Sequence, residues 1–263
     1  MNHYLQVARQ IAQEAGQLLL TEFHQPRVVE YKTEVDIVTA ADRKSEKLIV
    51  ERLHRVFPTH AIIAEEGSRR EARSEYCWFV DPLDGTTNFA HGYPVFAVSL
   101  ALVRGDDIRV GVVYDPVHEE MFHAVQGEGA CLNQRPIGVS SAPRLGESLV
   151  ATGFPTRKRH RHPNVAYFHR FTLLTHGVRR DGSAALDLCY VACGRFDGFW
   201  ELNLNPWDTA AGVLLVREAG GAVTDFQGLP FRLEHEEILA TNLHIHAEMQ
   251  QVLLAVAAEA PRG

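Results

Sequence analysis

Residues 81–87 read Asp-Pro-Leu-Asp-Gly-Thr-Thr, directly after a short apolar run at residues 77–80 that predicts a buried strand. Two carboxylates therefore lie three residues apart where this strand is expected to end. Carboxylates so close repel each other unless a hard cation lies between them, and oxygen-only ligands favour magnesium. Gly85 and Thr86 can expose backbone N–H groups at a helix start, where phosphate binds well. Together these features indicate metal-assisted phosphoryl chemistry.

An isolated Asp-x-x-Asp-Gly is more often a solvated turn, because Asp-Pro and Asp-Gly are ordinary turn dipeptides. Two further acidic positions favour a site instead. The apolar run at residues 62–64 ends in Glu65, and Asp208 begins a long apolar helix within Pro-Trp-Asp-Thr-Ala-Ala-Gly at residues 206–212. Acids at three predicted element ends, each beside small residues, indicate one shared constellation.

These stretches carry a family resemblance. Asp-Pro-Leu-Asp-Gly-Thr-Thr-Asn-Phe at residues 81–89, and residues 207–212 with Glu-Ala-Gly-Gly at 218–221, resemble the two signatures of the inositol monophosphatase family. That family belongs to the lithium-sensitive, magnesium-dependent phosphatases. The similarity runs over nearly the whole chain, and residues 151–155 and 182–187 are most similar to bacterial members.

The order of predicted elements indicates a layered α/β protein. Apolar residues recur at helical spacing near the N-terminus, and again after Thr39 and Asp42, which have the form of a capping box. Strands dominate the first half, and strand and helix then alternate. The resemblance implies an αβαβα sandwich, a single domain over residues 1–263 whose two lobes, about 1–143 and 144–263, share one active-site cleft. The predicted strands lie at about 61–64, 77–80, 95–103, 108–114, 120–125, 148–152, 196–201, 222–226 and 237–241, and the later helices at 165–174, 184–192, 209–219 and 244–258.

Composition favours a cytoplasmic enzyme. The chain has 263 residues, of which 46% are hydrophobic, enough to bury roughly three quarters of the surface of the unfolded chain. A net charge of −7 without a dominant basic region makes nucleic acid an unexpected partner. Four cysteines without a disulfide or zinc pattern fit a reducing compartment. The chain shows no secretory signal and no apolar run near the ~20 residues that cross a membrane.

The resemblance implies a set of magnesium ligands at the predicted strand ends. Two or three Mg²⁺ ions beside a phosphate need several fixed carboxylates to offset their charge, which agrees with such a set. The ligands implied are Glu65, Asp81, the backbone carbonyl of Leu83, Asp84 and Asp208.

The resemblance also implies a catalytic set of Thr86, Asp42 and Glu65. Thr86 and Asp42 would form a relay, since a threonine hydroxyl can accept a proton from water while donating to a carboxylate. Without the resemblance, Asp42 is better interpreted as a helix-capping acid, and it can do both. Lys32 precedes a loop, residues 33–36, that in the family moves over the metals. Taken alone, Lys32 would be a solvated surface residue.

The substrate would be held from two sides. Its phosphate would bind the N–H groups of Gly85 and Thr86 at the helix start. From the sequence alone, Glu201 is equally well interpreted as a salt-bridged edge residue. Asp187, one helical turn beyond Ser183, is better interpreted as structural. The resemblance implies the contacts to the substrate alcohol, namely Gly182, Ala184, Glu201 and Asp208. Asp181 is an unexpected residue before Gly182 and would alter the rim of this pocket.

These residues predict a Mg²⁺-dependent phosphomonoesterase that hydrolyses inositol 1-phosphate by in-line attack of a metal-activated water. The alternative is a related phosphatase of the same superfamily, whose substrate would be fructose 1,6-bisphosphate, histidinol phosphate or an adenosine bisphosphate. A substrate with two phosphates would need contacts from additional arginine or lysine side chains, for which Arg179 and Arg180 are candidates. A binding partner of the bacterial transcription machinery is an alternative of another class, with the basic run at residues 157–161 as a docking patch. By analogy with the family we also expect a homodimer.

Overall fold

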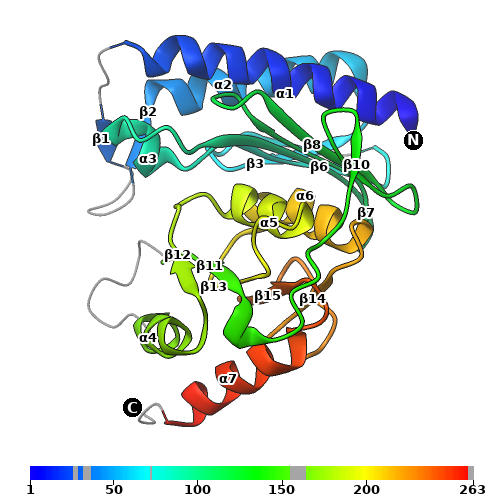
Figure 1. Cartoon of the computed structure of the whole chain (residues 1–263). Coiled ribbons are helices and arrows are strands. Elements are labelled where there is room, and N and C mark those ends of the chain that lie inside the picture. Colours follow the sequence, from blue (N-terminus) through cyan, green and yellow to red (C-terminus); the bar gives the residue numbers. More distant parts are fainter. Residues whose placement is uncertain (26–28, 32–36, 72, 155–163, 260–263) are drawn as a thin grey trace.

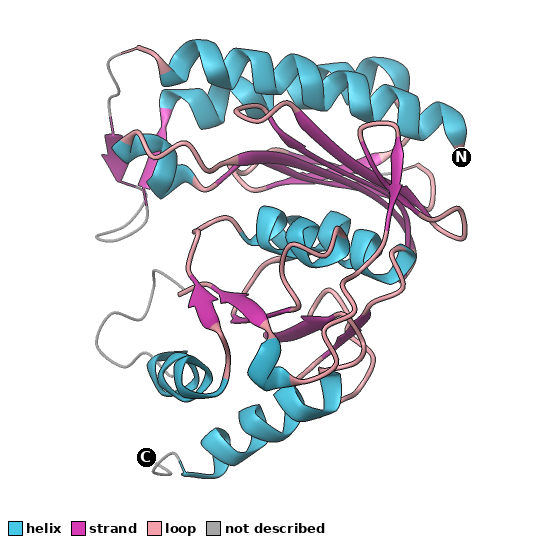
Figure 2. Cartoon of the chain, viewed as in Figure 1, coloured by secondary structure: helices cyan, strands magenta, loops and turns pink. Residues whose placement is uncertain are grey.

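The computed structural model of the chain describes residues 1–25, 29–31, 37–71, 73–154 and 164–259. Its helices and sheets alternate in five layers (Figure 1). Helices α1 (Asn2–Phe23) and α2 (Ala40–Val56) form the first layer, over a large sheet, and a small sheet lies farther down (Figure 2). The middle helices α5 (Ala184–Ala192) and α6 (Pro206–Glu218) lie between the two sheets.

The large sheet has eight strands in the order β10-β9-β8-β7-β6-β5-β3-β4. Strand β3 is parallel to β5, and the other neighbours are antiparallel. Its central strands are continuous apolar runs because helices cover both faces of the sheet. The strands are β3 (Ala61–Ala64), β4 (Arg69–Arg70), β5 (Tyr76–Asp84), β6 (Ala97–Arg104), β7 (Asp107–Asp115), β8 (Glu120–Val125), β9 (Ala130–Leu132) and β10 (Arg135–Ile137).

The small sheet has five strands in the order β12-β11-β13-β15-β14. Helices α4 (Asn164–Leu174) and α7 (His246–Glu259) cover its outer face (Figure 1). The strands are β11 (Leu149–Thr152), β12 (Gly177–Arg179), β13 (Gly198–Leu202), β14 (Ala222–Thr224) and β15 (Glu237–Thr241). Outside the layers lie the β1 (Val29–Tyr31) and β2 (Ile37–Thr39) pair, helix α3 (Thr86–His91) and a 3₁₀ turn, η1 (Leu145–Glu147).

Three apolar clusters fill the spaces between the layers. One lies between the first helices and the large sheet, one around the middle helices, and one between the small sheet and its outer helices. Helix α5 is buried on nearly every side, which explains why its sequence is apolar throughout rather than amphipathic. An ion pair also joins the layers, since Arg195, just beyond α5, donates to Glu120 of β8 at 2.6 Å.

The predicted layered α/β fold is confirmed. Strands β3, β8 and β15 and helix α5 have the predicted bounds, and the capping box of Thr39 and Asp42 begins α2. The prediction missed six strands of two or three residues, β1, β2, β4, β9, β10 and β12, because segments so short show no periodicity. The chain passes from the large to the small sheet between Ile137 and Leu149, and the two-lobe division near residue 143 stays a prediction. Within the described residues, no helix has the length and apolar character that crossing a membrane requires.

Candidate active site

Strand β5 carries the two aspartates of the central motif. The strand was predicted to end at Val80, but it continues to Asp84, and its pairing with β6 shifts register between Asp81 and Asp84. Pro82 explains the irregularity because it has no N–H to donate to a neighbouring strand. The Leu83 N–H donates instead to Asp81 Oδ1 at 3.0 Å. Both carboxylates therefore lie at the irregular end of a buried strand.

A turn at Gly85 follows immediately. Gly85 has a φ of +95°, and a Cβ atom at this position would lie 2.8 Å from the Val95 carbonyl oxygen. Only glycine fits both the left-handed conformation and the close approach. Helix α3 begins at the next residue, Thr86, so the sharp turn places the Thr86 hydroxyl beside the end of β5.

Four acidic residues gather at this end of the large sheet. Asp81 is 1% exposed, and burial raises its pKa well above the usual range. The negative charges of Glu65, Asp84 and Asp208 raise the same pKa further, which places these three carboxylates within electrostatic reach of Asp81. The structure thus brings together the four side chains that the sequence predicted as metal ligands.

The donor set fits a hard divalent cation. The four residues offer only carboxylate oxygens, and a cation would relieve their mutual repulsion. In the described part of the chain, no three acidic, histidine or cysteine side chains already have the arrangement of a complete metal site. Magnesium does not require one, because it retains several waters and shares its remaining positions with substrate phosphate. The residues fit a site that substrate completes.

Two of the acids are positioned by helix caps. Asp42 is the third residue of α2, where its Oδ2 accepts the Thr39 N–H at 2.8 Å. Asp208 is the third residue of α6, where its Oδ2 accepts the Asn205 N–H at 2.7 Å. In each case the cap fixes one carboxylate oxygen and thereby the orientation of the group. The interpretation of Asp42 as a capping residue is confirmed.

Asp42 also contacts Thr86. The Thr86 hydroxyl is 2.9 Å from Asp42 Oδ1 and 3.1 Å from the Leu83 carbonyl oxygen. Asp42 is fully buried, and this burial raises its pKa, while hydrogen bonds from Thr39 and Thr86 act in the opposite direction. The pair predicted as a relay is therefore in direct contact.

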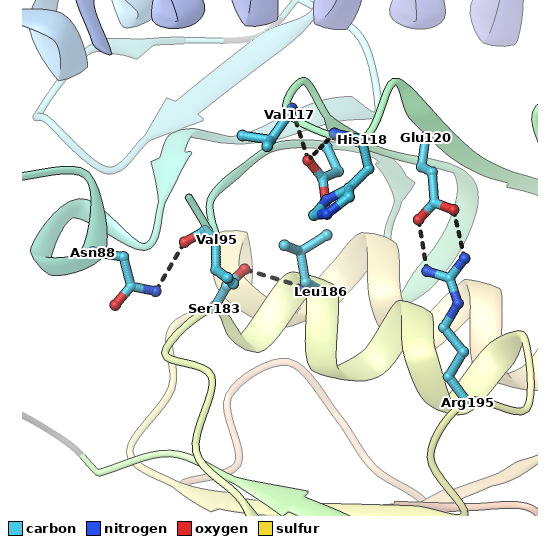
Figure 3. Close-up of polar contacts among 9 residues, drawn as sticks. Asn88, Val95, Val117, His118, Glu120, Ser183, Leu186 and Arg195 are labelled. Atoms are coloured by element: carbon cyan, nitrogen blue, oxygen red, sulfur yellow. Dashed lines mark hydrogen bonds and ion pairs between the residues drawn. The ribbon is translucent and has the colours of Figure 1, made fainter. Parts of the chain in front are cut away.

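The start of α5 holds Asp84. Asp84 Oδ2 accepts the Ser183 hydroxyl at 2.5 Å and the Ala185 N–H at 2.8 Å. The Ser183 hydroxyl oxygen in turn accepts the Leu186 N–H at 3.3 Å, as Figure 3 shows. Burial raises the pKa of Asp84 to about 6, although these hydrogen bonds lower it. Sequence reasoning missed Ser183, whose signal was a serine directly before a predicted helix.

Asn88 is a second residue that sequence reasoning missed. Its amide donates to the Val95 carbonyl at 2.8 Å (Figure 3) and to the Asp181 carbonyl at 2.7 Å. These bonds join α3 to the loop that carries Gly182 and leads into Ala184, two of the predicted alcohol contacts. The motif itself contains Asn88, but nothing in the sequence indicated which distant carbonyl it would meet.

Glu201 approaches the acid cluster from the small sheet. It belongs to β13, an interior strand, and is 6% exposed, so its interpretation as an edge residue is wrong. Burial and the charges of Asp208 and Asp84 raise the pKa of Glu201 to about 8, and Arg180 lowers it. A Cβ atom on Gly153 would overlap the Glu201 carboxylate, so any larger residue there would have to displace that side chain.

Asp187 of α5 lies beside these groups. It is 1% exposed, and neither carboxylate oxygen has a hydrogen-bond partner within the described residues. Burial raises its pKa well above the usual range, and Asp181, Glu201 and Asp84 raise it further. Two other predicted features, Lys32 with its loop and the basic run at 157–161, lie outside the described residues.

Comparison with known proteins agrees with this geometry. The sequence profile of the inositol monophosphatase family matches residues 1–262. An inositol-1-monophosphatase of Synechocystis sp. is 47% identical over 96% of this chain and 89% of its own. A putative Nus factor SuhB of Neisseria meningitidis serogroup B is 43% identical over 97% of this chain and 99% of its own.

A solved structure shares the fold as well as the sequence. The inositol monophosphatase of Anabaena (Nostoc) sp. superposes with a TM-score of 0.88 at 45% identity. The match covers 97% of this chain and 96% of the other. The match therefore includes all five layers of the fold. This chain belongs to the inositol monophosphatase family.

Proposed function

We propose that the chain is a magnesium-dependent phosphomonoesterase that hydrolyses inositol 1-phosphate to inositol and phosphate. The observation that carries the proposal is the meeting of four carboxylates with the Gly85 turn and the Thr86–Asp42 pair at one end of the large sheet. Relatives named inositol-1-monophosphatase support the choice of substrate.

The cation ligands are the first part of the proposal. Bound Mg²⁺ would supply positive charge that offsets the phosphate and stabilises the in-line transition state. Two or three ions are proposed because the set provides five donor groups at separate points, namely four side-chain carboxylates and one backbone carbonyl. The proposed ligands are Glu65, Asp81, the carbonyl of Leu83, Asp84 and Asp208.

The remaining steps belong to the protein's own groups. The Thr86 hydroxyl donates toward Asp42, which leaves its lone pairs to accept a hydrogen bond from the attacking water. A water oriented in this way can attack the phosphorus in line with the leaving alcohol, with Glu65 beside it as a further acid. The Gly85 and Thr86 N–H groups would hold the phosphate oxygens at the helix start.

The substrate alcohol would be held from the other side of the site. Glu201 can accept hydrogen bonds from neighbouring ring hydroxyls, with Asp208 nearby. Gly182 and Ala184 would line the same side, at the loop that Asn88 fixes. Ring binding would therefore depend on the small-sheet side, and phosphate binding on the large-sheet side.

A panel of phosphate esters tests the proposal. Purified chain with millimolar Mg²⁺ should turn over inositol 1-phosphate with a higher kcat/KM than histidinol phosphate, fructose 1,6-bisphosphate or adenosine 3′,5′-bisphosphate. Chelation should abolish turnover, and Mg²⁺ should restore it, while Ca²⁺ and Li⁺ should inhibit. Preference for another ester would overturn the substrate, and full activity after exhaustive chelation would overturn the metal dependence.

A second candidate function is a partner role in transcription. It is favoured by relatives named Nus factor, which are up to 45% identical to this chain. Pull-down from bacterial lysate with the inactive Asp84→Asn variant separates this role from catalysis, since RNA polymerase or its factors should still be retained. A homodimer is also proposed, and light scattering of the purified chain should give twice the chain mass.

A further inference from the structure

Helix α2 carries three neighbouring polar side chains on its buried face, Asp42, Ser45 and Glu46. Apolar residues such as Ile49 and Leu53 continue the same face into the core. Buried polar groups at the end of an apolar stripe are costly unless they are hydrogen-bonded, so their partners show what the helix holds. Asp42 contacts Thr86, and the partners of the other two lie on two different segments of the site.

Glu46 holds the turn that carries Glu65, residues 64–68, here called the Glu65 turn. Glu46 is 4% exposed, and its two oxygens accept the N–H groups of Glu66 at 2.7 Å and Ser68 at 3.1 Å. Within the turn itself, the Ala64 N–H donates to the Ser68 carbonyl at 3.0 Å. Glu46 thus fixes the backbone directly beside a proposed cation ligand.

Ser45 holds the second segment. It is fully buried, and its hydroxyl donates to the Pro82 carbonyl at 2.8 Å. Pro82 lies between Asp81 and Leu83, in the stretch where β5 is irregular and cannot rely on a regular ladder. Adjacent residues of one rigid helix therefore bind two of the three segments that carry the proposed ligands, the Glu65 turn and the Asp81–Asp84 segment.

We propose that Ser45 and Glu46 are positioning residues of the cation site, which set the distance between the Glu65 turn and the Asp81–Asp84 segment. This inference rests on the proposed function, because it concerns the same site. Carboxylates that repel one another would separate unless the backbone that bears them is fixed from outside. Outer groups of this kind often change metal affinity 10- to 100-fold when they are removed.

Two variants test the inference. Glu46→Gln presents one NH₂ group where two N–H donors need acceptors, so one bond is lost and the turn is released. Ser45→Ala removes a single hydroxyl and leaves the surrounding packing nearly unchanged. The readout is Mn²⁺ binding without substrate, measured by electron paramagnetic resonance. We expect the dissociation constant to rise roughly tenfold for Glu46→Gln and about threefold for Ser45→Ala.

The chain offers a matched control for each variant. Glu218 also accepts two backbone N–H groups, those of Gly127 at 2.8 Å and Gly129 at 2.9 Å, at a turn away from the site. Ser148 is fully buried and donates to the Leu145 carbonyl at 2.7 Å. Glu218→Gln and Ser148→Ala should lose similar stability and yet bind Mn²⁺ as the unmodified protein does.

Kinetics gives the second readout. The Mg²⁺ concentration for half-maximal hydrolysis should rise in Glu46→Gln, while kcat at saturating Mg²⁺ stays within about threefold of the original. Unchanged Mn²⁺ affinity in both variants would overturn the inference about Ser45 and Glu46. The proposed function is tested separately, since it stands as long as the unmodified chain hydrolyses inositol 1-phosphate. Should Glu46→Gln fail to fold, Ser45→Ala against Ser148→Ala decides the question alone.

Discussion

The Thr86 hydroxyl lies 2.9 Å from Asp42 Oδ1 and joins the start of α3 to the first turn of α2. Asp42 is fully buried, and its other oxygen already accepts the N–H and the hydroxyl of Thr39. The carboxylate is therefore held in one orientation, and the hydroxyl hydrogen of Thr86 is used in the hydrogen bond to it. What remains available on Thr86 is an acceptor.

Thr86→Val should lower kcat at least a hundredfold without unfolding the chain. Valine matches threonine in shape but cannot accept a hydrogen bond from water, and positioned proton acceptors contribute about 10²–10⁴-fold. Steady-state kinetics measures the loss, and Thr86→Ser should recover most of it. Thr87→Val, at the exposed neighbouring residue, is the control and should keep its activity. Comparable loss in both variants would mean that Thr86 acts through local structure alone.

Asp84→Asn should abolish hydrolysis while the fold stays intact. The substitution removes a charge from the acid cluster, yet its amide can still accept from Ser183 and the Ala185 N–H. Loss of a cation ligand should lower the rate by several orders of magnitude, about 4 kcal/mol or more. Circular dichroism checks the fold. A folded variant with more than a tenth of the original activity would contradict the assignment.

The acid cluster was the part of the candidate site that the sequence predicted best. Its acids follow apolar runs or begin a helix, and each such boundary is visible as a change in hydrophobic pattern. The pattern located Glu65, Asp81, Asp84 and Asp208 without showing how they meet. The order of the long strands and helices along the chain was predictable for the same reason, because such elements have strong periodicity. Their arrangement in five layers was implied by the family resemblance.

The supporting contacts were not predictable. Ser45, Glu46 and Asn88 donate to or accept from backbone groups up to 94 residues away, and the sequence does not indicate which backbone group a side chain will meet. Gly153 is another case, since the reason for its glycine is the carboxylate of Glu201 on a neighbouring strand. Such residues become visible only when the sheets are assembled.

Asp187 gives a pH-dependent prediction. Its folded-state pKa lies well above the ordinary value of 3.8 that it has in the unfolded chain. Between the two values the folded state binds more protons than the unfolded state, so this group lowers stability as pH rises through that window. Asp187→Asn removes the effect, so its advantage in unfolding free energy over the original chain should grow as the pH rises through this window.

Urea unfolding at pH 5 and pH 7 in the presence of a chelator measures this difference. The advantage of Asp187→Asn over the original chain should be larger at pH 7 than at pH 5. Asp106→Asn is the control, since the Asp106 side chain is 87% exposed. Equal differences at both pH values would show that Asp187 keeps its charge in the fold.

Glu201→Gln should separate recognition of the ring from chemistry at the phosphate. Glu201 would meet ring hydroxyls, whereas the Gly85 turn and the acid cluster would meet only the phosphate. Loss of one charge-assisted hydrogen bond should cost about 1.5–3 kcal/mol of transition-state binding. The kcat/KM for inositol 1-phosphate should therefore fall roughly ten- to a hundredfold. Assays in buffer above the Glu201 pKa of about 8 keep the original carboxylate charged.

Glycerol 2-phosphate is the matched substrate, because it shares the reacting group but has no ring. Its kcat/KM should change less than threefold in Glu201→Gln, so the ratio of the two esters cancels general damage to the site. Gly153→Ala should shift the same ratio, since a methyl group there overlaps the Glu201 carboxylate and must displace it. An equal loss on both esters would make Glu201 structural, and no loss on either would point to another natural substrate.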